Sequence, residues 1–123
     1  MLLGRLLNCA QRGDACLLFS AEMSATQIIH RMASIMSRVP LWKVRKNLAS
    51  STEVNTYRRA IHAIADMPVW IVDDPSPDLS VMYAQAMRLK AKHNLKLVGF
   101  DYDEKMSSQA QSEELRVSQI AQN

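Results

Sequence analysis

Three short apolar runs, separated by segments with helical periodicity, constrain the fold of this chain more than any other feature. The runs cover residues 15–19, 69–72 and 95–100. Each has the length of one strand and is bounded by turn-forming residues, and the first two read as buried strands. Strands that alternate with helices favour right-handed crossovers and a mostly parallel sheet. We therefore predict an α/β fold with about three parallel strands.

The predicted helices have clear start and stop signals. Ser24 and Ser50 each begin a capping-box pattern, in which the serine side chain accepts a hydrogen bond from the third helical N–H group. Asp78 is suited to cap the helix after the second apolar run. We expect Pro40 to close the helix that begins after Ser24, and Asn94 to end the helix before the third run.

Length and composition fit one soluble domain. The 123 residues are 48% hydrophobic and 22% charged, with a net charge of +3, which is ordinary for a globular protein. We predict a single domain over residues 1–123, whose polar C-terminal segment, residues 107–123, forms an amphipathic helix. No apolar run approaches the ~18 to 20 residues of a membrane span, and the opening residues lack a signal-peptide pattern. We therefore expect a cytoplasmic protein without a membrane partner.

The cysteine, histidine and basic residues are interpreted as structural or surface residues rather than as parts of a metal, disulfide or phosphate-binding site. Cys9 and Cys16 are too few for a disulfide framework or a zinc site, so we expect buried, reduced thiols. The three histidines lie far apart and lack metal-ligand spacing. Basic pairs such as Arg58 and Arg59 are scattered along the chain, and we interpret them as solvated helix faces rather than phosphate contacts.

Carboxylates gather where the predicted strands end. Glu22, Asp73, Asp74 and Asp101 each follow one of the apolar runs. In a parallel sheet the carboxyl ends of the strands lie along one edge, where ligands bind. The sequence therefore predicts that these acidic side chains converge at one site.

Two motifs and one helix pattern carry a family resemblance. Residues 19–24 read FSAEMS, close to the family pattern FSLEMS, and residues 98–102 with Met106 resemble the second nucleotide-binding (Walker B) motif. Between them, residues 88–93 fit the pattern RLKxxH. From Leu17 onward the chain resembles the C-terminal, RecA-like ATPase domain of DnaB-type replicative DNA helicases. Other RecA-like proteins, including recombinases and clock ATPases, are the alternative.

This resemblance implies a three-layer α/β/α domain and roles for two carboxylates. Members of the family hydrolyse ATP with Mg²⁺ at the subunit interfaces of a hexameric ring of identical subunits, and translocate on single-stranded DNA to unwind the duplex. By resemblance, Glu22 polarises the attacking water and Asp101 holds Mg²⁺ through water. The structural alternatives are a glutamate that flanks a helix N-terminus and an ordinary aspartate at a strand end.

The chain departs from the family pattern at the phosphate-binding loop. Its only glycines are Gly4, Gly13 and Gly99, so GxxxxGK[ST] does not occur in these 123 residues. Residues 103–105 (DEK) replace the family's LQL and add two carboxylates beside Asp101. The chain also stops in the helix after the second motif. We therefore expect a truncated, partial RecA-like domain that neither binds ATP and Mg²⁺ nor turns over by itself.

Two further hypotheses remain open at this point. The chain is alternatively a non-enzymatic interaction module that docks on an intact helicase ring and modulates it, a role that suits a phage or prophage product. Another possibility is a split motor, in which a second polypeptide supplies the phosphate-binding loop. Inhibition of an intact helicase distinguishes the module from an inert remnant.

Overall fold

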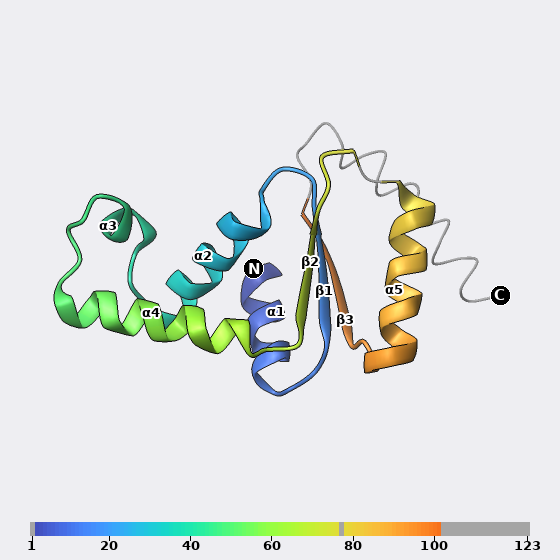
Figure 1. Cartoon of the computed structure of the whole chain (residues 1–123), viewed down its shortest axis with the longest axis horizontal. Coiled ribbons are helices and arrows are strands. Elements are labelled where there is room, and N and C mark those ends of the chain that lie inside the picture. The colour runs from blue at the N-terminus through green and yellow to red at the C-terminus, as the bar shows by residue number, and fades with distance from the viewer. Residues whose placement is uncertain (1, 77, 102–123) are drawn as a thin grey trace.

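The structure, a computed structural model, describes residues 2–76 and 78–101, in which helices alternate with short strands (Figure 1). The elements follow in the order α1 (Leu2–Gln11), β1 (Cys16–Ser20), α2 (Ala25–Ser37), α3 (Leu41–Arg45), α4 (Ser51–Ala65), β2 (Val69–Asp73), α5 (Leu79–His93) and β3 (Leu97–Asp101). This order confirms the predicted α/β class.

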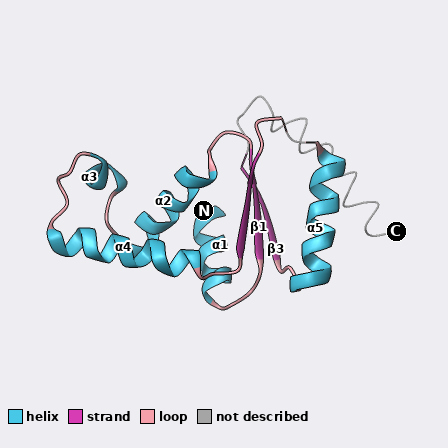
Figure 2. Ribbon diagram, in the orientation of Figure 1, coloured by secondary structure: helices cyan, strands magenta, loops and turns pink. Residues whose placement is uncertain are grey.

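The strands form a parallel sheet in the order β2-β1-β3, with β1 in the centre. Helices α1, α2 and α4 cover one face, and α5 covers the other, so the described residues make three layers (Figure 2). The pair α3 and α4 extends away from the sheet beside α2 (Figure 1). The register places Ser20 opposite both Asp73 and Asp101, so the three strands end level with one another.

Alternating side chains of the strands supply two separate cores. Cys16 and Leu18 of β1 face the larger core, with Leu6 of α1 and Ile28 and Met32 of α2. The second core contains Leu17 and Phe19 of β1 and Met82 of α5, with half-buried apolar residues of β2 and β3 around them. All five residues of β1 are buried because helices cover both of its faces and strands flank both of its edges.

The predicted helix signals are confirmed by the local geometry. Ser24 and Ser50 both form complete capping boxes, and the Asp78 carboxylate accepts hydrogen bonds from the first-turn N–H groups of α5. Asn94 ends α5 in the left-handed conformation, as expected. Helix α2 ends at Ser37, before Pro40, because Arg38 adopts a left-handed φ of 61° and closes it.

Two strand predictions need correction. Residues 69–72 were expected to be buried, but the residues of β2 from Val69 to Val72 are only half-buried and Asp73 is exposed. The physical reason is that, within the described residues, β2 pairs with β1 alone and forms an edge of the sheet. Strand β3 begins at Leu97 rather than Leu95, which belongs to the connection from α5. The helix predicted in residues 107–123 lies outside the described residues.

Both thiols lie in the larger core. Cys9 and Cys16 are free and buried, as predicted. Burial, together with a hydrogen bond to Cys9, raises the pKa of the Cys16 thiol to about 12. Across the part of the chain that the structure describes, no helix has the length and apolar character of a membrane span.

Candidate functional site

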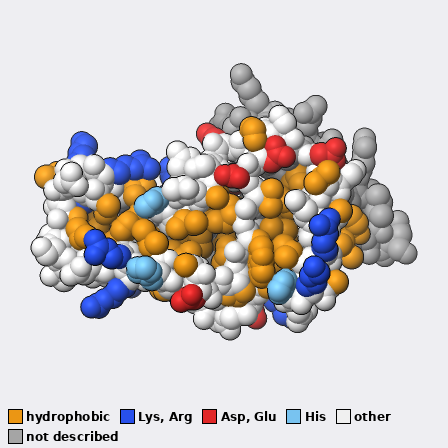
Figure 3. Space-filling view, viewed as in Figure 1, with side chains coloured by type: hydrophobic (Ala, Val, Ile, Leu, Met, Phe, Trp, Pro, Cys, Tyr) orange, Lys and Arg blue, Asp and Glu red, His pale blue; other side chains and the backbone are white. Residues whose placement is uncertain are grey.

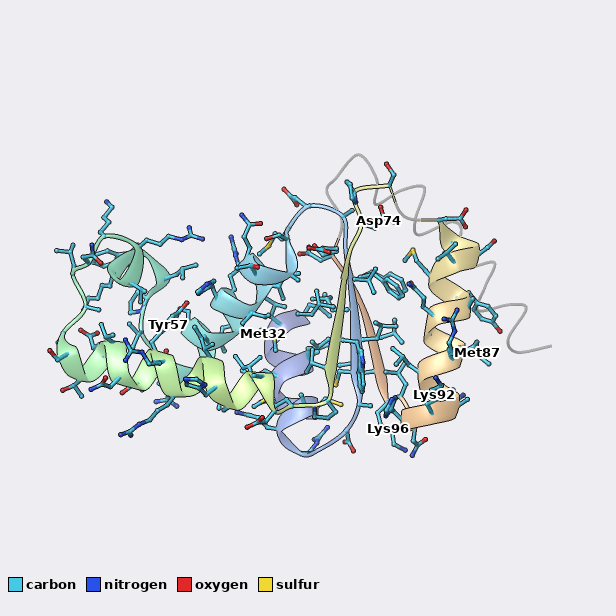
Figure 4. All side chains as sticks on the ribbon, viewed as in Figure 1. Met32, Tyr57, Asp74, Met87, Lys92 and Lys96 are labelled. Atoms are coloured by element: carbon cyan, nitrogen blue, oxygen red, sulfur yellow. The ribbon has the colours of Figure 1, made fainter. Side chains whose placement is uncertain are left out.

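The candidate site lies at the edge of the sheet where the three parallel strands end. Ser20 ends β1 in the centre, Asp73 ends β2 on one side and Asp101 ends β3 on the other. Neighbouring strands are ~4.8 Å apart, so the backbones of these residues form one short row. The structure thus brings the three strand ends together as the sequence predicted, and Figure 4 shows Asp74 at the same end of the sheet. Among the described residues, however, the predicted carboxylates do not form a group of three or more that could hold a metal ion.

Ser20 anchors the loop that follows β1. It is 2% exposed, and its Oγ atom accepts a hydrogen bond of 3.1 Å from the Met23 N–H group. Its carbonyl oxygen accepts from the Asp74 N–H group at 3.0 Å, and the next residue, Ala21, donates its N–H to the Asp101 carbonyl at 3.0 Å. The start of the loop is therefore bonded to both neighbouring strand ends.

Asp73 anchors the far end of the same loop. Its Oδ2 atom accepts a hydrogen bond of 2.8 Å from the N–H group of Ala25, the first residue of α2. A carboxylate at a helix N-terminus also interacts favourably with the helix dipole. Together with the Ser24 capping box, this bond fixes where the loop ends and α2 begins.

Glu22 lies in the middle of this anchored loop. Its side chain is exposed, so the carboxylate reaches solvent at the edge of the sheet. Because the backbone on both sides of Glu22 is held by hydrogen bonds, the loop restricts where that carboxylate can lie. An exposed, positioned carboxylate of this kind is able to accept a proton from water.

Asp101 occupies the end of β3 with a half-buried side chain. Across the described residues, no group of three or more histidine, cysteine or acidic side chains could hold a metal ion. A single carboxylate suits a contact with hydrated Mg²⁺, which keeps several waters and takes few protein ligands.

Two site residues have roles that the sequence did not reveal. From the sequence we predicted that Asp73 lies at the end of its strand, but not that it accepts a hydrogen bond from Ala25. Ser20 was not singled out from the sequence at all. A serine three residues before the Met23 N–H group is a local signal for such a bond. Asp74 differs from the other predicted carboxylates, because it accepts from the Ser76 N–H group at 2.9 Å within its own turn.

Comparisons with known proteins decide the family. Residues 2–123 match the family model for the DnaB-like helicase C-terminal domain. This chain belongs to that family. It is 32% identical over 109 residues to the replicative DNA helicase DnaB of Mycobacterium intracellulare, a match that covers 87% of this chain and 19% of that protein. The DnaB protein of Rickettsia typhi is 29% identical over 104 residues, which are 85% of this chain and 21% of that relative.

Solved structures confirm the fold of this DnaB-like domain. The ATPase domain of G40P superposes with a TM-score of 0.73 at 22% identity, covering 82% of this chain and 37% of that chain. A DnaB-like replicative helicase studied with primase gives a TM-score of 0.72 at 22% identity, covering 81% and 25%. The sheet is therefore that of a RecA-like ATPase domain. The chain spans about a fifth of the length of the curated DnaB relatives it matches.

Proposed function

We propose that this chain carries the water-activating and ion-binding carboxylates of a DnaB-type replicative helicase, on a partial ATPase domain. The observation that carries this proposal is the loop with Glu22, which is bonded to both neighbouring strand ends beside Asp101. The family role is ATP-dependent DNA unwinding during replication, with single-stranded DNA and identical subunits of a hexameric ring as partners.

Glu22 acts as the general base in this proposal. Its carboxylate accepts the proton of a water molecule as that water attacks the γ-phosphate. The anchored loop keeps the carboxylate at the carboxyl edge of the sheet, so little reorganisation is needed when the water is polarised. ATP and Mg²⁺, when bound, supply the phosphoryl group and neutralise its developing charge.

Asp101 would hold Mg²⁺ through water from the end of the adjacent strand. The hydrogen bond from the Ala21 N–H group to the Asp101 carbonyl ties this position to the Glu22 loop. This contact between the two strand ends supports assigning Glu22 and Asp101 to one site.

We further propose that these 123 residues alone have no ATP turnover. The sequence contains no GxxxxGK[ST] loop, so it lacks the backbone N–H groups and the lysine that hold the phosphates. Without such a cradle, the two carboxylates repel a polyphosphate rather than bind it. The carboxylates need a phosphate-binding loop beside them in order to act.

A chimera tests the roles of the two carboxylates. Residues 2–101 replace the matching segment of the Mycobacterium intracellulare DnaB protein, whose own sequence then supplies the rest of the ATPase domain. We expect the chimera to hydrolyse ATP and Glu22→Gln to lower kcat by at least about a hundredfold, the range for loss of a general base. Asp101→Asn should lower activity and raise the Mg²⁺ concentration that is required.

Glu53→Gln is the matched control for the chimera. Glu53 caps α4, far along the chain from the strand ends, and its exchange removes the same charge. An active chimera in which Glu22→Gln has no larger effect than Glu53→Gln contradicts the proposed role of Glu22.

One observation favours a second candidate function, an interaction module that docks on an intact helicase. Trp42 of α3 and Leu48 just after it are 54% and 62% exposed, so the segment between α2 and α4 presents apolar surface. Exposed apolar residues of this size are common where proteins associate. Adding the chain to an intact DnaB-type helicase and measuring unwinding tests this function. Inhibition that rises with concentration and is lost in Trp42→Ser, Leu48→Ser supports it.

A further inference from the structure

The outer edge of β2 has backbone groups that face away from the sheet. Among the described residues β2 pairs only with β1. Bonds from Cys16 N–H to the Pro68 carbonyl (2.9 Å) and from Asp74 N–H to the Ser20 carbonyl (3.0 Å) show which residues face β1. Because residues of a parallel strand alternate in direction, the N–H and C=O groups of Ile71 point outward. An edge of this kind can pair with another strand.

A groove runs between this edge and α5. It has a volume of about 380 Å³, and Leu17, Trp70 and Leu89 contribute apolar side chains to it. The Trp70 and His93 rings contact each other with centroids 4.7 Å apart. Figure 3 shows apolar side chains across the middle of this face of the molecule, with lysine and arginine side chains on both sides of them. The groove therefore offers both apolar contact and charge.

The charge of the groove is unequal along its length. Arg88, Lys92 and His93 line it from α5, and Lys92 is labelled near the carboxyl end of that helix in Figure 4. Helix α5 runs back along the sheet after β2, so Lys92 and His93 lie near Trp70 in the first half of the strand. Asp73 and Asp74 lie at the other end of β2, so the groove is more positive beside the first half of the strand than at its carboxyl end.

We propose that this groove binds an extended acidic peptide segment of a partner protein, which adds to the sheet as a strand beside β2. The backbone of the segment pairs with the outward N–H and C=O groups of Ile71. Its side chains alternate, so acidic residues at every second position face Arg88 and Lys92, and apolar residues face the opposite side of the sheet.

The backbone chemistry favours a peptide over a nucleic acid. A strand edge presents donors and acceptors in alternation, and a peptide backbone carries both. A phosphodiester backbone offers acceptors only, so it leaves the Ile71 carbonyl without a partner. Asp73 at the end of the groove also repels a uniformly charged polyanion.

The experiment uses Trp70 as its own reporter. In a Trp42→Phe background, where Trp70 is the remaining tryptophan, a peptide of about seven residues that alternates valine and glutamate is titrated into the full chain. We expect a saturable change in Trp70 fluorescence. Arg88→Gln, Lys92→Gln should raise the Kd about tenfold, the effect of losing two partly exposed ion pairs. The control Arg58→Gln, Arg59→Gln removes the same charge from the exposed face of α4 and should leave the Kd unchanged.

Two further probes separate strand addition from simple charge attraction. A valine–glutamate peptide that is N-methylated at alternate residues keeps its charge but loses its edge donors, and we expect it to bind at least about tenfold more weakly. Equal binding of the methylated peptide overturns the proposal. So does the absence of saturable binding by the unmodified peptide. Tighter binding of oligothymidylate that depends on Arg88 and Lys92 overturns it in favour of a nucleic-acid surface.

Discussion

Replacing Asp73 tests whether a carboxylate on β2 holds the loop that carries Glu22. In the structure, Asp73 Oδ2 accepts a hydrogen bond of 2.8 Å from the Ala25 N–H group, which is 48 residues away in the chain. Asp73→Ala removes this bond and leaves the first N–H group of α2 to water. The same change removes a negative charge from the helix N-terminus.

The magnitude follows from these two losses. A hydrogen bond to a charged group contributes about 1.5–3 kcal/mol, and less where water competes, as it does at the exposed Asp73 side chain. The helix dipole adds about 0.3–1 kcal/mol, whereas the Ser24 capping box still supports the helix. We therefore expect Asp73→Ala to lower the free energy of unfolding by about 1–2 kcal/mol.

Urea denaturation followed by circular dichroism measures this change. With a slope of about 1.5 kcal/mol per molar urea, the midpoint should fall by about 1 M. Asp73→Asn keeps an acceptor oxygen and should show a smaller shift. The matched control is Asp74→Ala, because the Asp74 carboxylate accepts a hydrogen bond from the Ser76 N–H group within its own turn. Equal midpoints for Asp73→Ala and Asp74→Ala would refute the reasoning.

Three other predictions follow from the cores and caps. Gly99→Val should destabilise the domain by about 1–3 kcal/mol in the same assay, because a Cβ atom added at position 99 would already lie 3.2 Å from the Leu18 side chain. An unchanged urea midpoint contradicts this. At pH 8 the buried Cys16 thiol, with its pKa of about 12, should react with iodoacetamide more than about a hundredfold more slowly than in the urea-unfolded chain, and equal rates would show that it is accessible. A hydrogen bond from the Ser50 backbone lowers the pKa of Glu53 below 4.5. The ionised Glu53 carboxylate therefore contributes fully to stability above pH 4.5, and this contribution is lost as the pH falls below that value. Glu53→Gln should flatten this acid limb of the stability profile, and an unchanged limb counts against the capping contact.

Local signals in the sequence were sufficient to predict the elements. The Ser24 and Ser50 boxes and the Asp78 cap involve residues within three positions of one another, so their geometry follows from the chain itself. The parallel sheet followed from the alternation of runs and helices, and the family followed from two motifs at its strand ends. The Glu22 and Asp101 roles stay predictions that rest on that family.

The features that the sequence did not reveal depend on strand order. Alternation predicts parallel strands but not that β2 lies at an edge, so the half-exposed β2 was wrongly expected to be buried. The bond between Asp73 and Ala25 joins residues that are 48 positions apart, and it exists only because β2 lies beside β1.

The end of α2 before Pro40 is a local feature that the sequence also did not reveal. Arg38 ends the helix in the left-handed conformation, although this position does not have the glycine that usually marks such an end.

Calorimetric titration of the purified 123-residue chain with ATP and Mg²⁺ tests the central claim most directly. The claim is that this chain carries the carboxylates Glu22 and Asp101 but has no loop that holds the phosphates, so it does not bind ATP by itself. We expect no saturable heat at micromolar ATP, for the chain itself and for the Glu22→Gln, Asp101→Asn double variant. Saturable binding by the original chain that is lost in the double variant would contradict the claim, because the two carboxylates would then form a working nucleotide site without that loop.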